Sequence, residues 1–424
     1  MELVKLAING FRGFKNKQII NFPANKQPVV FVGINGAGKT SLLDAIRLGL
    51  RPFYKSLLVE QEELEVSPYN IHLEKEAMTL ALDWTYSLES NQAIYQTKIR
   101  TNRTVQPLTS VEEQPSTTDL VADMKSKISL YKNEYSLGLL VYYPSDRSVS
   151  APEIDDQTGE NFGQLSAMSN ATTSNIDFKT FFQWFRLTED IENEKRLTED
   201  PRYKEPKLQA VKNAILAFLD NFSDLRIQRS PFSDMVIKKE GQKLSVNQLS
   251  SGEKSLLTIV GDLARRLAIA NPGLPNPLHG QAIVLIDEVD LHLHPKWQKE
   301  IVAKLQETFP NIQFILSTHS SLVIKHLKTE SIFLVDNFEC RPAKQTDLVT
   351  YGAGLGKLLA WQGVEGGVIP NDIREAINSI AQLIQAKELE EAKRELVALK
   401  QQIDPTHDEI LDLQTQLEMK ELDL

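Results

Sequence analysis

Cysteine is nearly absent from this chain, which has a single one among its 424 residues. That residue, Cys340, cannot form an internal disulfide, and a lone cysteine excludes any zinc site built from several cysteines. Proteins without disulfides are typical of reducing compartments. We therefore expect a protein that folds without disulfides in the cytoplasm.

Long hydrophobic runs are missing too. Residues 282–286 form the longest purely apolar run near the motifs described below, far short of the roughly 20 residues that a membrane-spanning helix needs. The N-terminal sequence MELVKLAING turns polar too early to contain the apolar core of a signal peptide. The sequence therefore predicts no membrane partner.

There is no excess of basic residues, because 57 acidic residues outnumber 47 Lys and Arg residues and give a net charge of -10. This balance disfavours a wholly basic surface for nucleic acid, but a local basic patch is compatible with it, so DNA binding stays open. The composition, 41% hydrophobic and 25% charged, is typical of soluble globular proteins. At about 150 residues per domain, the length predicts two or three structural units.

A glycine-rich segment at residues 33–40, GINGAGKT, matches the phosphate-binding pattern G-x-x-x-x-G-K-[ST]. It lies between an apolar run of buried-strand length at 28–32 and a run with helical spacing at 41–50, which is the required strand–loop–helix setting. Glycines let backbone N–H groups approach phosphates, Lys39 can reach the terminal phosphates, and the Thr40 hydroxyl can bind Mg²⁺. A glycine turn without function is the alternative. The expected ATP contacts are Asn35, Gly36, Gly38, Lys39, Thr40 and Ser41.

Two carboxylates end an apolar strand at residues 283–288, IVLIDE. Asp287 suits a contact with Mg²⁺, and Glu288 suits a general base that accepts a proton from the attacking water. Acidic residues at a strand end can also be merely solvated. The upstream glycine-rich loop favours the catalytic interpretation.

The segment LSSGEK at 249–254 resembles the signature of ABC-type ATPases, with Ser250 and Gly252 at the positions of the family's serine and second glycine. Such a serine can be only an N-cap, but a helix N-terminus also suits an anion.

His319 directly follows an apolar strand and resembles the family's switch histidine, which contacts the terminal phosphate. Residues 290–294 fall where the family's D-loop crosses between subunits. The resemblance implies a head-to-tail homodimer whose ATP sites are shared between two copies.

The opening residues 9–14, NGFRGF, strengthen this resemblance, which is to ABC-type ATPases of the SMC-like, RecF and overcoming-lysogenization-defect grouping. It implies that Arg12 approaches the nucleotide, and a purely structural strand is the alternative. Two positions depart from the family. Residues 142–147, YYPSDR, contain no Gln where a Q-loop is expected, and His294 stands where transporter-type D-loops carry Asp. The residue that links magnesium to an inserted lobe is therefore not assigned.

The predicted fold class is α/β, a P-loop ABC-type ATPase head with an antiparallel β subdomain, an inserted helical lobe and a C-terminal helical extension. Strand-like runs at 78–84, 93–100 and 139–143, separated by polar loops such as 106–119, indicate the antiparallel part. Further parallel strands are predicted at 312–317 and 331–335. The predicted units are 1–145, the first part of the head; 146–232, the lobe; 233–350, the second part of the head; and 351–424, a helical region for a partner or for assembly.

Aromatic residues at near-helical spacing follow residue 178, and we interpret the cluster around Trp184 as core rather than as a surface that stacks on bases. Residues 371–424 carry apolar residues at helical spacing and predict three amphipathic helices. Their apolar stripes could bury a partner helix or associate with a second copy. The segment GAGLGK at 352–357 imitates a phosphate loop, but its glycine spacing does not fit, so a hinge or turn is predicted.

The function follows from the branch of the family that this chain resembles. It lacks the long periodic arms and the paired cysteines of the zinc-hook repair ATPases, residues 255–259 do not resemble transporter subunits, and no carboxylate cluster follows His319 as in nucleases of the overcoming-lysogenization-defect class. The chain is most similar to compact bacterial anti-phage ATPases of the Septu and retron-associated type. That family pairs the ATPase with a separate HNH nuclease.

We therefore expect hydrolysis of ATP with Mg²⁺ that controls a partner nuclease, in a homodimer or a higher assembly. The alternative is a RecF-like clamp that binds DNA for repair. Salt-dependent DNA binding by the protein alone would favour the clamp, and copurification of a small nuclease would favour the first hypothesis.

Overall fold

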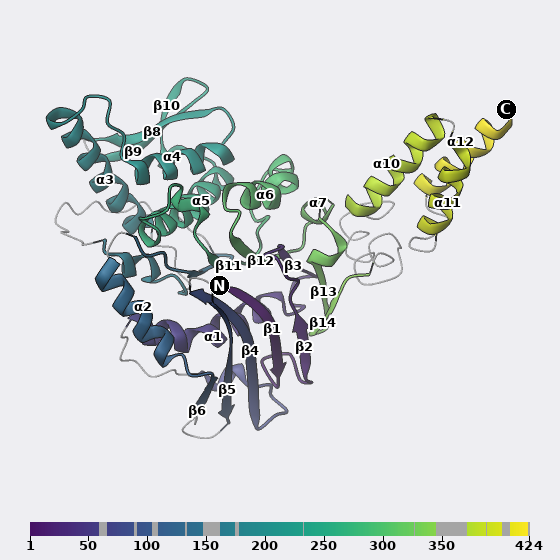
Figure 1. Ribbon diagram of the computed structural model, residues 1–424, viewed down its shortest axis with the longest axis horizontal. Helices are drawn as coiled ribbons and strands as arrows, with labels where there is room; N and C mark the ends of the chain where they lie inside the picture. Colours follow the sequence, from purple (N-terminus) through teal and green to yellow (C-terminus); the bar gives the residue numbers. More distant parts are fainter. Residues whose placement is uncertain are drawn as a thin grey trace.

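The chain is described by a computed structural model, which contains three β-sheets and a set of helices around them (Figure 1). The described residues are 1–58, 66–88, 91–103, 109–131, 134–146, 162–173, 178–231, 233–325, 327–344, 371–386, 388–400 and 408–422.

The central sheet contains six strands. They are β3 (Val29–Val32), β7 (Leu139–Tyr143), β11 (Ala282–Ile286), β12 (Ile312–Thr318), β13 (Ile332–Asp336) and β14 (Glu339–Pro342). Their order is β14-β13-β3-β12-β11-β7, and every neighbouring pair is parallel except β13 with β14. β3, β7, β11 and β12 are buried at every residue, as expected for parallel strands covered on both faces. The parallel strands predicted at 312–317 and 331–335 are confirmed.

The placement of the strand at 139–143 in the antiparallel part is wrong. In the structure β7 pairs with β11 in parallel register, with Leu139 opposite Ala282 and Tyr143 opposite Ile286. All five of its residues are buried. A half-exposed antiparallel strand would alternate buried and exposed residues, so the continuous apolar run LLVYY indicates the parallel sheet.

The second sheet is antiparallel and has the order β2-β1-β4-β5-β6. Its strands are β1 (Glu2–Asn9), β2 (Gln18–Asn21), β4 (Ala77–Leu88), β5 (Asn91–Asn102) and β6 (Thr109–Gln114). The antiparallel strands predicted at 78–84 and 93–100 are confirmed. The prediction of a polar loop at 106–119 is wrong, because this range contains β6 and the start of α2 (Thr118–Tyr131). β6 is an edge strand with no buried residue, so its sequence carries no apolar alternation.

Helix α1 (Lys39–Leu58) begins in the glycine-rich loop and packs against the antiparallel sheet. The rings of Phe53 on α1 and Trp84 on β4 have centroids 4.9 Å apart, and both residues are fully buried. Such aromatic pairs add to the apolar area that packing removes from water. The helix that carries Lys39 is therefore fixed by residues far from the loop itself.

The lobe contains α3 (Phe178–Thr198) and α4 (Pro206–Phe218), followed by a sheet of β8 (Phe222–Gln228), β9 (Asp234–Lys239) and β10 (Gln242–Ser245). Trp184 is 4% exposed, which confirms its interpretation as core. The description of 146–232 as polar and then helical is wrong at its end, because β8 lies there. A register shift between Ser223 and Arg226 interrupts the alternation of β8, and this hides the strand in the sequence. The boundaries of the predicted units stay predictions.

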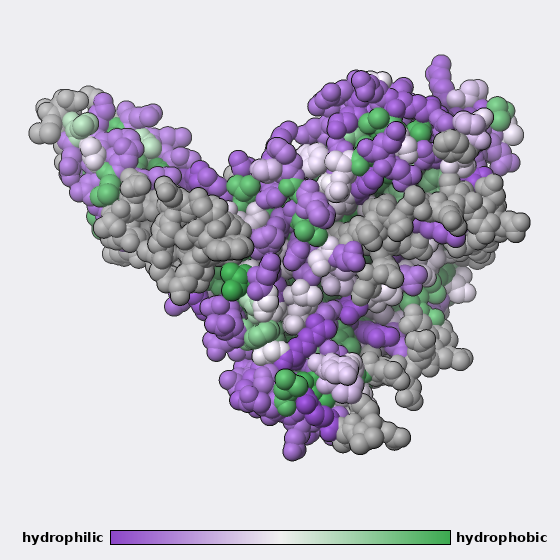
Figure 2. All heavy atoms as spheres, turned by 180° about the vertical axis from the view of Figure 1, so that it is seen from behind, coloured by the Kyte–Doolittle hydropathy of each residue, from purple (hydrophilic) through white to green (hydrophobic). Residues whose placement is uncertain are grey.

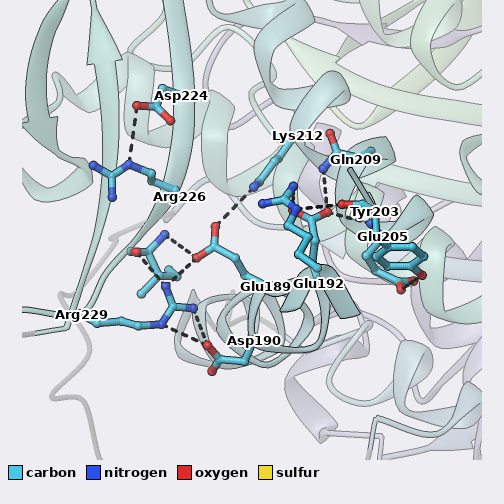
Figure 3. A network of polar contacts seen from close by, with 12 residues as sticks. Glu189, Asp190, Glu192, Tyr203, Glu205, Gln209, Lys212, Asp224, Arg226 and Arg229 are labelled. Carbon is cyan, nitrogen blue, oxygen red and sulfur yellow. Dashed lines mark hydrogen bonds and ion pairs between the residues drawn. The ribbon is translucent and has the colours of Figure 1, made fainter. Parts of the chain in front are cut away.

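A buried carboxylate joins the two lobe helices to the three-stranded sheet (Figure 3). Glu189 on α3 accepts hydrogen bonds from Lys212 on α4 at 3.3 Å, from the Ile227 N–H on β8 at 3.0 Å and from Arg229 at 3.1 Å. Its side chain is 7% exposed. Because removing one partner of a buried ion pair is costly, this network fixes the lobe as one unit.

Helix α5 (Ser251–Ala270) is anchored to the central sheet by a buried ionic network. Asp262 accepts hydrogen bonds from Arg265 at 2.7 Å, from Arg266 at 2.7 Å and from the Tyr143 hydroxyl at 3.0 Å. Burial alone would raise the pKa of Asp262, but the charges of Arg266 and Arg265 outweigh burial and lower it to about 2. The carboxylate therefore stays ionised and holds α5 against the end of β7.

The remaining helices of the head are α6 (Pro295–Thr308) and α7 (Ser321–Ile324). Five short 3-10 helices complete the described part of the head: Pro68–Asn70, Gln164–Met168, Val246–Gln248, Pro277–His279 and Thr329–Ser331. No helix among the described residues is both long and apolar enough to span a membrane.

Three C-terminal helices, α10 (Asn371–Gln385), α11 (Leu389–Lys400) and α12 (Asp408–Leu422), confirm the prediction for residues 371–424. Their apolar residues pack together in a core of their own, with Ile380, Ala392 and Ile410 fully buried. The expectation that these stripes are free for a partner is therefore wrong in this structure. In the view of Figure 2 the outer surface of these helices is mainly hydrophilic.

Candidate functional site

The predicted motifs meet at one edge of the central sheet. β3, β12 and β11 are neighbours and run parallel (Figure 1), so their carboxyl ends lie at the same edge. The glycine-rich loop follows β3, Asp287 follows β11, and His319 follows β12. Ligand sites of open parallel sheets lie at this edge.

The glycine-rich loop has the backbone that a phosphate cradle requires. Gly36 and Gly38 have φ angles of 81° and 112°, a region that residues with a Cβ rarely adopt. Asn35, Gly36 and Thr40 are exposed, and Gly38 and Ser41 are partly exposed. The predicted loop residues are therefore accessible to a ligand, and several backbone N–H groups lie at the start of α1.

Lys39 lies beneath this loop and is 5% exposed. Its ammonium donates hydrogen bonds to the carbonyl oxygens of Gly33 at 2.8 Å and Ile34 at 3.0 Å. Burial lowers the pKa of Lys39, while the nearby charges of Glu288 and Asp287 oppose that shift. A desolvated ammonium beside carboxylates is suited to an anionic ligand such as a terminal phosphate.

Thr40 and Asp287 are brought together from residues far apart in the chain. The Thr40 hydroxyl donates a hydrogen bond to Asp287 Oδ2 at 2.8 Å, and Asp287 is 2% exposed. Mg²⁺ prefers oxygen ligands and is often held by one or two carboxylates together with substrate phosphates. A hydroxyl and a carboxylate next to the glycine-rich loop fit such a site.

Glu288 adopts a φ of 48°, which is uncommon for a residue other than glycine and is frequent at functional sites. Its N–H donates a hydrogen bond to the Ser317 hydroxyl at 2.7 Å. The same hydroxyl donates to Asp287 Oδ1 at 2.5 Å. Ser317 therefore fixes the backbone of one acidic residue and the side chain of the other.

Ser317 was not among the residues predicted from the sequence, although the signal was present. Ile286 pairs with Leu316 in the parallel register of β11 and β12, so the next residues, Asp287 and Ser317, lie level with each other. A polar residue one position beyond the apolar run of β12 is a candidate contact for the acidic pair on β11.

His319 lies beside the same edge, with a side chain that is 32% exposed. Its Nδ1 lies 3.6 Å from Asp290 Oδ2, and the Thr318 hydroxyl donates a hydrogen bond to the other oxygen of Asp290. Asp290 is 4% exposed. This buried carboxylate can orient the imidazole ring, a role that the sequence analysis did not assign.

Arg12 is held by two residues that were also not predicted from the sequence. Its guanidinium pairs with Asp44 on α1 at 2.7 Å and donates a hydrogen bond to the Asn70 side chain at 3.1 Å. The side chain is 33% exposed, and the backbone φ is 48°. Asp44 lies one turn after Thr40 on α1, so Arg12 is tied to the helix that begins in the glycine-rich loop.

Ser250 is the N-cap of α5 in a reciprocal capping box. Its hydroxyl accepts from the Glu253 N–H at 3.4 Å, and its N–H donates to Glu253 Oε2 at 2.8 Å. Ser250 is therefore an N-cap, and it is exposed at a helix N-terminus, so its contact with a nucleotide stays a prediction. An added Cβ on Gly252 would lie 2.4 Å from the carbonyl oxygen of His292, so only glycine fits where the 290–294 segment crosses α5.

The segment predicted at the Q-loop position is described only in part, because residues 147–161 lie outside the described residues. The backbone carbonyl of Tyr143 accepts a hydrogen bond from the Asp287 N–H at 2.9 Å. The end of β7 therefore contacts the acidic pair directly. The predicted hinge at 352–357 also lies outside the described residues.

A phosphate-binding loop after β3 and an acidic pair after β11, at the same edge of the central sheet, define a nucleotide-binding protein of the P-loop class. The family model described as "AAA domain, putative AbiEii toxin, Type IV TA system" matches residues 29–325. The chain belongs to this family of ATPase domains. ATP binding follows from that membership.

Curated relatives agree with the resemblance to retron-associated and Septu ATPases. The chain is 31% identical over 371 residues to the "Retron Vc95 probable ATPase" of Vibrio cholerae serotype O1 biovar El Tor, covering 75% of this chain and 70% of that protein. It is 28% identical over 403 residues to the "Retron Ec83 probable ATPase" of Escherichia coli, covering 80% and 72%. It is 24% identical over 191 residues to "Septu protein PtuA" of Bacillus thuringiensis, covering 44% and 47%. The predicted family resemblance is confirmed.

Proposed function

We propose that this protein is an ATP-hydrolysing switch of an anti-phage system of the retron or Septu kind, and that its ATP state controls a partner nuclease. The observation that carries the proposal is the hydrogen bond of 2.8 Å between Thr40 and Asp287, with Glu288 next in the chain. It supports the proposal because the glycine-rich loop, a carboxylate suited to a cation and a candidate base lie together at one edge of the sheet.

The residues around this edge have different roles in hydrolysis. Lys39 and the loop N–H groups bind the terminal phosphates, and Thr40 and Asp287 would hold Mg²⁺. When bound, the metal supplies positive charge that neutralises the phosphate oxygens. Glu288 accepts the proton of the attacking water, and Ser317 keeps the Glu288 backbone in place. His319, oriented by Asp290, contacts the terminal phosphate.

The second half of each site comes from another copy of the chain in a head-to-tail homodimer. Ser250 is exposed at the N-terminus of a 20-residue helix whose positive dipole end suits phosphate oxygens. The capping box and the contact between Gly252 and His292 give this helix end a defined shape. Both features support presentation of the signature to a second subunit.

Mixing two inactive variants tests the shared site. A Lys39→Ala chain lacks the phosphate lysine, and a Ser250→Arg chain blocks the signature, so each homodimer should hydrolyse no ATP. A heterodimer contains one site built from the intact loop of one chain and the intact signature of the other, so hydrolysis should return. Steady-state phosphate release by purified heterodimers measures this. Mixing two differently tagged Lys39→Ala preparations is the control, and inactive heterodimers would mean that each site is complete within one chain.

The partner is proposed to bind outside the ATPase head. The C-terminal helices have a hydrophobic core separate from that of the head, so they form an added element that the head does not need for its own packing. With their apolar stripes buried in that core, a partner would contact the outer surface of these helices, part of which is the mainly hydrophilic face in Figure 2, or the lobe. A companion HNH nuclease is the partner that the family resemblance implies.

Deleting residues 371–424 is therefore expected to leave ATP hydrolysis near that of the full chain, because the head core is intact. The shortened protein should lose a copurifying nuclease, or the higher assembly, when it is isolated from the native host. Light scattering and mass spectrometry of the complex measure both. If the shortened protein keeps all of its partner, the partner must bind the lobe instead of the C-terminal helices. Metal-dependent DNA cleavage by the single purified chain, lost when its own carboxylates are changed, would remove the separate nuclease from the proposal.

A further inference from the structure

A cavity of about 330 Å³ lies along the outer part of α1, away from the glycine-rich loop. Three cations line it, Arg47, Arg51 and Lys55. They are spaced four residues apart on one helix, so they form a row on one face with roughly 6 Å between successive positions. Residues of the 168–173 segment form the opposite wall.

The charges of this cavity are unbalanced. Among the described residues that line it there is no carboxylate. Arg47 is held by Asp44 at 2.9 Å and donates to the Thr172 carbonyl at 2.9 Å, but neither Arg51 nor Lys55 forms an ion pair with a described residue. Lys55 is nevertheless only 8% exposed. Buried cations are normally paired, and like charges one helical turn apart repel each other, so a counter-anion would relieve this arrangement.

Ordinary helix chemistry explains only part of the row. A cation in the last turn of a helix is favoured by the helix dipole, and this accounts for Lys55. Arg51 and Arg47 lie one and two turns earlier, where the dipole effect has faded. Their alignment with Lys55 around a concave space therefore needs another explanation.

We propose that this cavity is a second anion site, separate from the nucleotide loop, that binds a ligand with at least two successive phosphates. Arg51 and Lys55 supply charges that have no ion-pair partner among the described residues, Arg47 supplies a guanidinium already fixed by Asp44, and the exposed Asn170 supplies a polar group from the opposite wall. The length of the row exceeds a single phosphate. The backbone of a single nucleic-acid strand and a free polyphosphate share this chemistry, and the test separates them.

The test compares variants of the full chain in the presence of saturating Mg-ADP, so that the glycine-rich loop does not compete. A fluorescein-labelled thymidine oligonucleotide is titrated by anisotropy, and sodium tripolyphosphate is titrated by calorimetry. The double variant Arg51→Gln with Lys55→Gln should weaken binding by at least about tenfold, for whichever of the two probes binds the unchanged protein. For the oligonucleotide it should also lower the slope of log K against log salt by about 0.7 per lost contact.

Two further variants test whether a loss of binding comes from this cavity, rather than from lower overall positive charge or from misfolding. Asn170→Asp changes no atom of α1 but adds a negative charge to the opposite wall, so it should weaken binding in the same direction. Lys179→Gln with Lys299→Gln removes two positive charges from exposed positions on α3 and α6 and should leave binding unchanged. Binding of the oligonucleotide alone identifies a strand as the ligand, and binding of tripolyphosphate identifies a free polyphosphate. Equal affinity in all variants, or no saturable binding of either probe, overturns the proposal.

Discussion

Replacing Glu288 with glutamine is expected to slow ATP hydrolysis by about 10² to 10⁴, while ATP binding persists. Glutamine has nearly the same shape but cannot accept a proton from water at neutral pH. The Glu288 backbone, with its φ of 48° and its hydrogen bond to Ser317, does not depend on the carboxylate, so the variant should keep the local structure. The proposed ATP-bound dimer should then persist, because hydrolysis no longer opens it.

Single-turnover hydrolysis and light scattering with ATP measure the two effects. Glu307→Gln, which removes one negative charge from an exposed position on α6, is the matched control and should hydrolyse ATP at the normal rate. A rate near normal in Glu288→Gln would mean that another group activates the water. Loss of ATP binding would place Glu288 in the nucleotide pocket as a structural residue.

The contacts of Ser317, Asp290 and Asp44 show where prediction from the sequence stops. The glycine-rich loop and the acidic pair could be found because each is a short string directly after an apolar strand. Ser317 lies 30 residues from Asp287, and their contact exists only because β11 and β12 pair in one parallel register. Asp44 meets Arg12 from 32 residues away. Such pairs depend on tertiary packing, which no local pattern contains.

The fold was also predictable only in part. The strands of the central sheet are rich in buried apolar residues, and four of them were recognised as strands of that sheet. β7 was recognised as a strand but assigned to the other sheet, because a run of five residues indicates a strand without naming its neighbour. β6 and β8 were missed for physical reasons. β6 buries none of its residues, and β8 contains a register shift that breaks its alternation.

The buried stripes of the C-terminal helices mark another limit. The spacing of their apolar residues correctly predicted amphipathic helices, but amphipathicity does not say what covers the apolar face. In the structure α10, α11 and α12 cover one another, with Ile380 and Ile410 fully buried. A search for the surface that would bind the proposed partner should therefore start on the outer faces of these helices and on the lobe, where exposed residues can be changed without opening a core.

Changing Lys39 to alanine is expected to abolish ATP binding. The ammonium is the cation placed beneath the glycine-rich loop, and hydrogen bonds to charged groups are stronger than neutral ones, so its loss removes a large share of the phosphate-binding energy. The fold should survive the change. Burial lowers the pKa of Lys39, which means that the folded protein disfavours the charged form, so removing the ammonium also removes a desolvation cost.

Nucleotide titration and thermal unfolding with and without ATP test this directly. ATP at about 100 times its dissociation constant should stabilise the normal protein by about 2.7 kcal/mol, and it should not stabilise Lys39→Ala. Lys328→Ala, which removes a cation from an exposed position, is the control and should keep the full ATP-dependent stabilisation. A folded Lys39→Ala protein with unchanged ATP affinity would contradict the assignment of residues 33–40 as the phosphate-binding loop, because no other lysine or arginine lies within that loop.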